Sequence, residues 1–229
     1  MIDLLVIAPH PDDAEIGMGG SIVKMRAEGL RVGVLDLTNG EPTPHGDVAT
    51  RELETQAATA VLGLDWRENL GLTNRELQAT LAARGAVAQV LRRTRPRWLF
   101  APYWIDAHPD HVAAAQLIDD ARFWSKLTKS SLAGEPHHPE RVFHYFSIHL
   151  RLPVVPSFIA DISAEFPRKM ESLRCYQSQF VTGREHDGVS VLDRVRGQAE
   201  YWGHMIGCRY GEPFSCREVP GLTGWRQMR

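Results

Sequence analysis

LLVIAPHPDD, residues 4–13, is the most informative segment of this 229-residue chain. Its first half is an unbroken apolar run, which is typical of a β-strand buried on both faces of a parallel sheet. Its second half places His10, Asp12 and Asp13 directly after that strand. Ionisable side chains at the carboxyl end of a buried strand predict a functional loop, because ligands bind at that edge of parallel sheets.

A second segment repeats this arrangement much later in the chain. The apolar run over residues 98–101 precedes His108-Pro109-Asp110-His111. Pro109 suits the first turn of a helix expected over residues 112–129. His108 and His111 are three residues apart, so both can face one point. Either motif alone could be a simple capped turn between strand and helix, but two of them favour a shared site.

His10, Asp13 and His111 form a candidate set of metal ligands. A catalytic zinc usually takes three nitrogen or oxygen ligands from the protein and leaves one position for water or substrate. Asp12 and His108 then remain for proton transfer. Iron or cobalt can also occupy a His/His/Asp site, so the sequence leaves the metal open between Zn²⁺, Fe²⁺ and Co²⁺.

Strands and helices alternate along the chain. We expect strands over residues 4–8, 30–37, 98–101, 142–148 and 158–162, and helices over residues 19–28, 50–62, 74–95, 112–129, 163–176 and 191–205. Ser163 is the expected N-cap of its helix, although Pro167 could be the first helical residue. The alternation predicts a mostly parallel sheet with helices on both faces, a Rossmann-like three-layer αβα sandwich. The loops after the strands, including residues 38–41, should meet in one crevice.

Composition places limits on partners and location. A content of 43% hydrophobic residues over 229 positions suits one compact domain spanning residues 1–229. A net charge of -2 gives no general basis for binding nucleic acid or an anionic membrane. The N-terminus lacks a secretory pattern and no apolar run approaches the ~20 residues that span a bilayer, so we expect a soluble cytoplasmic protein.

The cysteines argue against a disulfide framework. There are three, Cys175, Cys208 and Cys216, with no Cys-x-x-Cys pair. We expect reduced thiols, and the sequence leaves open whether Cys208 and Cys216 are neighbours.

The two motifs resemble those of the LmbE-like, or PIG-L-type, zinc-dependent N-acetylglucosamine deacetylases, and the resemblance covers almost the whole chain. The segments IGMGG, YQSQF and YGEPF, residues 16–20, 176–180 and 210–214, are most similar to the bacillithiol-type enzymes. The resemblance implies that the protein removes acetate from N-acetylglucosaminyl malate, a small-molecule conjugate. It also implies one Zn²⁺ per chain and a homo-oligomer, either a trimer or a hexamer.

The resemblance also assigns roles to individual residues. It implies that His10, Asp13 and His111 bind the metal, that Asp12 accepts a proton from the attacking water, and that protonated His108, oriented by Asp110, stabilises the oxyanion. A nearby carboxylate raises a histidine pKa, which suits that role for His108. The alternative for the aspartates is that they cap the helices that follow.

Arg51 resembles the family arginine that contacts substrate, and the carboxylates of malate would suit a guanidinium. The alternative is a local pair with Glu54, three residues further on. One family feature is missing, because residues 183–200 contain no counterpart of the loop tyrosine and Val191 falls near its expected position. Either His186 or Tyr210 replaces it, or the oxyanion relies on zinc and His108 alone.

Other functions remain as alternatives. The substrate could instead be a chitooligosaccharide or an inositol-linked conjugate, since the sequence does not identify the aglycone. A dinucleotide-binding oxidoreductase is suggested by Gly17 and Gly19 after the first strand, but Ile22 breaks the required G-x-G-x-x-G spacing. A non-catalytic carbohydrate- or metal-binding module would have no need of Asp12.

Overall fold

The computed structural model describes residues 1–149, 153–182 and 188–221. Its elements are β1 (Leu4–Ala8), α1 (Asp13–Ala27), β2 (Val32–Thr38), α2 (Val48–Leu62), β3 (Trp66–Leu72), α3 (Leu81–Thr94), β4 (Trp98–Pro102), α4 (Pro109–Ser125), β5 (Arg141–Tyr145), β6 (Phe158–Asp161), α5 (Phe166–Arg174), α6 (Gln177–Phe180), α7 (Val191–Met205) and β7 (Gly211–Ser215). The strands form one 7-stranded sheet in the order β3-β2-β1-β4-β5-β7-β6. The pairs from β3 through β5 are parallel, while β7 runs antiparallel to both of its neighbours.

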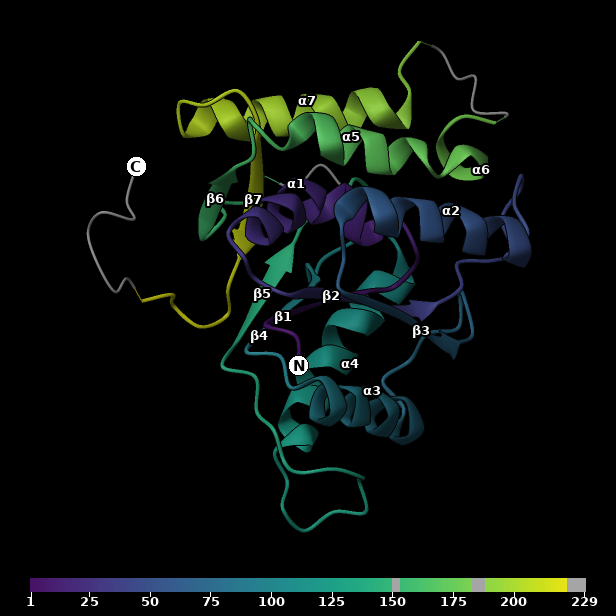
Figure 1. Ribbon diagram of the computed structural model, residues 1–229, viewed down its shortest axis with the longest axis vertical. Helices are drawn as coiled ribbons and strands as arrows, with labels where there is room; N and C mark the ends of the chain where they lie inside the picture. The colour runs from purple at the N-terminus through teal and green to yellow at the C-terminus, as the bar shows by residue number, and fades with distance from the viewer. Residues whose placement is uncertain (150–152, 183–187, 222–229) are drawn as a thin grey trace.

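Helices cover both faces of this sheet (Figure 1). α3 and α4 lie against one face, α1 and α2 lie against the other, and α5 and α7 form a further layer outside α1 and α2. This arrangement confirms the predicted class, an α/β sandwich around a mostly parallel sheet.

β1 contributes to the core on both faces of the sheet, because its side chains alternate between the two faces. Leu5 and Ile7 pack in the apolar cluster beneath α3 and α4. Leu4 and Val6 pack in the opposite cluster with α1. Each such buried aliphatic side chain stabilises the fold by roughly 1.5–3 kcal/mol relative to an exposed one.

The strand order also fixes the position of the functional loops. β2 pairs with one side of β1, and β3 lies beyond it at one edge of the sheet. The chain then returns, and β4 pairs with the other side of β1. The loops after β1 and β4 therefore diverge and leave a crevice between them at the carboxyl edge of the sheet. These two loops carry His10 and His108.

Two helix starts differ from the prediction for local reasons. α1 begins at Asp13 rather than at residue 19, and it continues through a kink at Met18, where φ is -151. The glycine-rich sequence around the kink hides this first turn from a propensity argument. α5 begins at Phe166 and is not capped by Ser163, whose Oγ donates to Asp161 Oδ1 at 2.6 Å instead.

Other differences come from exposure and length. α3 begins at Leu81 rather than at residue 74, and α4 ends at Ser125 rather than at residue 129. β3 was not predicted, because an edge strand with half-exposed residues lacks a continuous apolar run. β7 was not predicted either, since its sequence GEPFS contains two residues that disfavour strands.

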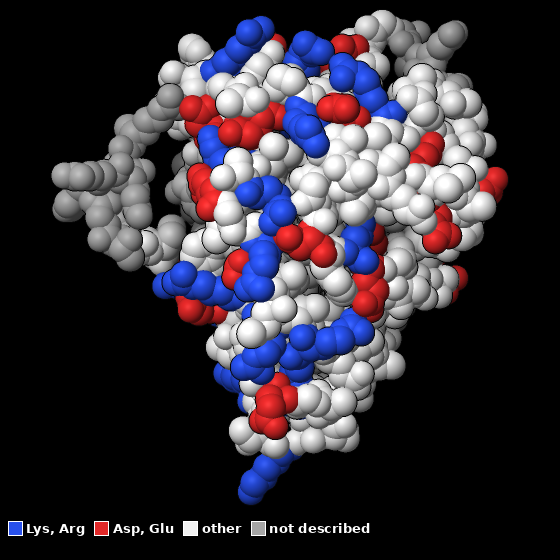
Figure 2. All heavy atoms as spheres, viewed as in Figure 1, with Lys and Arg blue, Asp and Glu red and all other residues white. Residues whose placement is uncertain are grey.

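The surface carries charges of both signs. On the face in Figure 2, Lys and Arg side chains alternate with Asp and Glu, and no large area has a single sign. Among the described residues, no helix is both long enough and apolar enough to cross a bilayer. The three thiols, all of them described, are not joined by a disulfide, and Cys208 Sγ instead lies 3.3 Å from the carbonyl oxygen of Tyr210.

Candidate metal centre

The three predicted metal ligands lie together at the carboxyl edge of the sheet. Asp13 Oδ2 is 3.0 Å from His10 Nδ1 and 3.2 Å from His111 Nε2. All three side chains are buried, and one ligand atom from each lies within 4.8 Å of the others. Two nitrogens and one oxygen thus converge from loops that are distant in sequence, which is a donor set suited to a divalent metal.

The turn between β1 and α1 directs its two aspartates to different sides. Asp12 has φ 106, a left-handed conformation that costs a non-glycine residue on the order of 1–3 kcal/mol. Asp13 points to the histidines, while Asp12 Oδ2 accepts a hydrogen bond from Arg51 Nη2 at 3.0 Å. The Asp12 side chain makes no cap hydrogen bond to α1, so the helix-capping alternative is wrong for this residue.

His111 provides an independent test of whether a metal fits. Its Nδ1 lies 3.1 Å from Asp106 Oδ2, and its buried Nε2 makes no hydrogen bond although Asp13 is close. A buried nitrogen in this position is costly unless Asp13, 3.2 Å away, holds it protonated or a cation uses its lone pair. The geometry around His111 is therefore what a metal ligand requires.

In the absence of a metal, the histidines of this site tend to be protonated. Burial disfavours the charged form of His111, but the carboxylates of Asp13 and Asp106 outweigh burial and raise its pKa to about 10. Burial also opposes protonation of His10, yet Asp13 raises its pKa as well. A metal must displace at least one of these protons in order to bind.

We therefore expect metal affinity to rise with pH. Below about 10 the metal-free protein holds the His111 proton, so the dissociation constant should fall at least about tenfold per pH unit between roughly pH 6 and pH 8. Competition with a chromophoric chelator at several pH values measures this slope, after correction for protonation of the chelator. An affinity that does not depend on pH would contradict the assignment of His111.

Asp12 is suited to proton transfer. Burial raises its pKa to about 7, although the neighbouring Arg51 acts in the opposite direction. A carboxylate whose pKa lies near neutral pH can both accept and return a proton efficiently.

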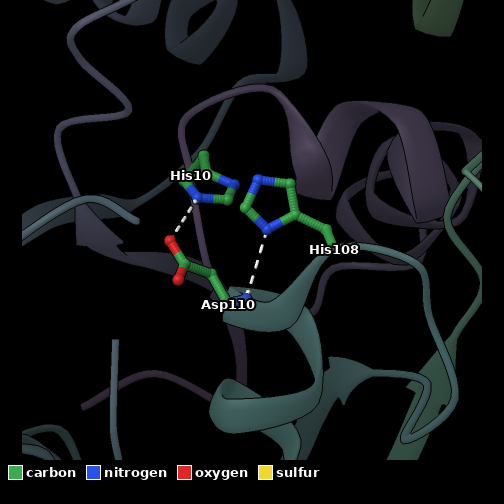
Figure 3. A group of neighbouring side chains, drawn as sticks. All are labelled: His10, His108 and Asp110. Atoms are coloured by element: carbon green, nitrogen blue, oxygen red, sulfur yellow. Dashed lines mark hydrogen bonds and ion pairs between the residues drawn. The ribbon is translucent and has the colours of Figure 1, made fainter. Parts of the chain in front are cut away.

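The Asp110 carboxylate makes no hydrogen bond to the His108 side chain, which it was predicted to orient. Figure 3 shows its carboxylate turned to His10, with Oδ2 3.1 Å from Nε2, while only its backbone N–H reaches His108 Nδ1, at 3.2 Å. Asp110 thus fixes His10, leaving His10 Nδ1 to face Asp13. His108, rather than Asp110, caps α4.

The predicted protonation of His108 also needs correction. Burial and the nearby His10 and His111 lower its pKa, and they outweigh the opposite effect of Asp110. Because Nδ1 accepts the backbone N–H of Asp110, the imidazole is neutral and carries its proton on Nε2. His108 therefore offers a neutral hydrogen-bond donor to the pocket.

Arg51 is buried beside Asp12 and is not paired with Glu54. Its Nη2 donates to Asp12 and, at 2.7 Å, to the Pro11 carbonyl, whereas Nε and Nη1 have no partner. Gly40, with φ 76, passes so close that a Cβ there would lie 3.0 Å from Nη2. Glu54 instead accepts from the Ser178 backbone at 2.6 Å, so the predicted local pair is wrong.

A cavity of about 460 Å³ is lined by His10, Asp12, Asp13, Arg51 and His108, and the buried His111 lies behind it. Besides the predicted residues it contains Arg75, His149 and Arg194, which the sequence did not single out because each lies outside a recognisable motif. Val191 also lines it, at the position where the loop tyrosine was sought. Tyr210 is instead stacked on Phe166 in the core, and His186 lies outside the described residues.

Comparison with known proteins finds similarity to deacetylases that act on N-acetylglucosamine derivatives. The family described as GlcNAc-PI de-N-acetylase (PIG-L) matches residues 5–122, which include both motifs. The diacetylchitobiose deacetylase of Thermococcus kodakarensis is 32% identical over 96% of this chain and 84% of its own length. A probable N-acetyl-alpha-D-glucosaminyl L-malate deacetylase 2 of Bacillus anthracis is 24% identical, over 87% of this chain and 93% of its own length. The crystal structure of a conserved protein from Thermus thermophilus has a TM-score of 0.90 and 41% identity, covering 98% of this chain and 99% of that one.

Proposed function

The chain belongs to the PIG-L (LmbE-like) family of GlcNAc-type deacetylases, and from this premise we propose that it hydrolyses the N-acetyl group of an N-acetylglucosamine conjugate. The observation that carries the proposal is the combination of two functions in one pocket. Three side chains converge as metal ligands, and a separate buried carboxylate, Asp12, lies beside them without serving as a helix cap.

We assign the metal to His10, Asp13 and His111, with Zn²⁺ as the ion and Fe²⁺ or Co²⁺ as substitutes that the same donors accept. A divalent cation held by these residues would supply Lewis-acid chemistry, because it would polarise the acetyl carbonyl and lower the pKa of water.

The protein groups then have distinct tasks. Asp12 accepts the proton of the attacking water, and Arg51, 3.0 Å away, holds the carboxylate in place. His108 donates its Nε2 proton in a hydrogen bond to the oxyanion that forms from the acetyl carbonyl, and this interaction is strongest in the transition state. Asp12 finally returns the proton to the leaving amine, which completes hydrolysis to acetate and a glucosamine conjugate.

A substrate panel tests this activity. Zinc-loaded protein should release free amine from at least one of N-acetylglucosaminyl malate, diacetylchitobiose and an inositol-linked N-acetylglucosamine. Prior treatment with a chelator should abolish the release, and added zinc should restore it. Absence of amine from every conjugate would overturn the proposed reaction.

We propose the malate conjugate as the substrate. Three arginines, Arg51, Arg75 and Arg194, line the pocket, and cationic side chains match the carboxylates of malate. The relative from Bacillus anthracis acts, by its name, on this conjugate. Diacetylchitobiose is the second candidate, because the relative from Thermococcus kodakarensis is more similar in sequence.

Assembly into a trimer or hexamer stays a prediction, which light scattering can test.

Replacement of Arg51 by Lys separates these substrates. Arg51→Lys keeps the charge but loses the Nε and Nη1 donors, which have no hydrogen-bond partner within the protein. We expect kcat/KM for the malate conjugate to fall roughly 5–150-fold more than kcat/KM for free N-acetylglucosamine. This factor corresponds to about 1–3 kcal/mol of transition-state binding, the range for hydrogen bonds to charged groups. Free N-acetylglucosamine serves as the reference substrate, because a disturbed Asp12 would lower the rate of hydrolysis of both substrates equally.

Arg196→Lys is the matched control, because Arg196 is exposed on α7 and does not line the pocket. It should leave both substrates unaffected. Equal losses on both substrates in Arg51→Lys would mean that Arg51 serves only to hold Asp12.

A further inference from the structure

Asp106 lies in the loop between β4 and α4, and its carboxylate is surrounded by hydrogen-bond donors. Its carboxylate accepts hydrogen bonds from the His108 backbone at 2.8 Å, from His111 Nδ1 at 3.1 Å and from His149 Nδ1 at 3.2 Å. Ser147 Oγ also donates to it. The side chain is only 4% exposed, so four donors from two segments, residues 108–111 and 147–149, replace water around one buried carboxylate.

This arrangement restrains the carboxylate as well as the histidine. The donors at His108, Ser147 and His149 occupy the remaining acceptor positions, so the carboxylate has no free direction in which to turn away from His111. A carboxylate can only accept, and it therefore keeps a proton on Nδ1 of the facing imidazole. When a metal displaces a proton from His111, the lone pair that becomes available is therefore on Nε2, the buried nitrogen that faces Asp13.

We propose that Asp106 is the positioning residue of the metal ligand His111, fixing both the tautomer and the direction of its ring. The inference rests on the proposed metal function of His111. Carboxylates that accept from the second ring nitrogen of a ligating histidine stabilise the bound metal, and their loss typically weakens metal affinity about 10–100-fold. Asp110 stands in the same relation to His10, with Oδ2 3.1 Å from Nε2, so each histidine ligand has its own carboxylate.

The test compares metal affinity in three proteins of full length. Wild type, Asp106→Asn and Ser147→Ala are stripped of metal and titrated with Zn²⁺ in competition with a chromophoric chelator. Ser147→Ala is the matched control, because it removes a hydrogen bond to the same oxygen but leaves His111 in contact with Asp106. We expect a dissociation constant about 10–100-fold higher in Asp106→Asn and a much smaller increase in Ser147→Ala, where three of the four donors still hold the carboxylate.

Two further readouts exclude a merely structural role. The metal-free variants are melted to verify that they fold, and the absorption spectrum of the Co²⁺-loaded protein should change in Asp106→Asn, because the ligand ring is no longer held in one orientation. A role in stability alone would lower the melting temperature without moving the spectrum or the affinity.

The outcomes separate this inference from the function on which it rests. Wild-type affinity and spectrum in Asp106→Asn, with binding lost in His111→Ala, would overturn the positioning role while leaving the metal site intact. Equal weakening in Asp106→Asn and Ser147→Ala would also overturn it, since the effect would then belong to the loop in general. A wild-type protein that binds no metal would overturn both proposals.

Discussion

Asp12→Asn should retain the metal and lose most of its turnover. The amide has nearly the same shape as the carboxylate but cannot accept the proton of the attacking water. Loss of a general base typically lowers kcat by about 10²–10⁴-fold. The three ligand side chains are untouched, so metal content measured on the purified variant should match that of wild type.

The surroundings of Asp12 sharpen this expectation. Arg51 donates to Asp12 Oδ2, and an asparagine oxygen can take over that contact. A large drop in kcat with little change in KM would therefore report lost proton transfer rather than lost binding. Glu52→Gln is a suitable control, because Glu52 is an exposed acid on the same helix as Arg51. Full activity in Asp12→Asn would show that Asp12 is not the general base. Loss of the metal in this variant would mean that Asp12 is the ligand and Asp13 the base.

His111→Ala should lose metal and activity together. The variant deletes one of three proposed ligands, so the dissociation constant should rise by more than the ~100-fold limit that is typical for residues behind the ligands. It also leaves the carboxylates of Asp13 and Asp106 without their shared partner, which destabilises a buried site. His111→Gln retains a polar side chain at the position, and a melting curve of each variant separates loss of metal from loss of fold. Full metal occupancy in a folded His111→Ala would contradict the ligand assignment.

The central part of the fold was predictable because it depends on local patterns. β1 is buried on both sides, so its five apolar residues identify it without further information. Pro109 and the polar start of α4 likewise specify a helix that begins directly after His108. Since parallel strands place their carboxyl ends at one edge, the parallel direction of the strands was enough to predict that His10, Asp13 and His111 meet.

The parts that could not be predicted depend on contacts between distant segments. Arg51 and Glu54 are neighbours on one helix, yet each has a stronger partner elsewhere, Asp12 for one and Ser178 for the other. Asp106 has no motif that distinguishes it from other loop acids, and its contacts appear only when the segment after β5 brings Ser147 and His149 to it. Asp110 lies next to His111 and two residues after His108 in the sequence, and only the fold decides that its carboxylate turns to His10.

The most direct test of the account is a metal titration of the stripped protein with activity as the readout. Protein freed of metal by a chelator should be inactive towards its best N-acetylglucosamine conjugate. Added Zn²⁺ should restore activity in proportion to the amount added, with a plateau at one equivalent per chain, because the proposed ligands form a single site. Full activity in the stripped protein, or a plateau that needs two equivalents, would contradict hydrolysis at one metal held by His10, Asp13 and His111.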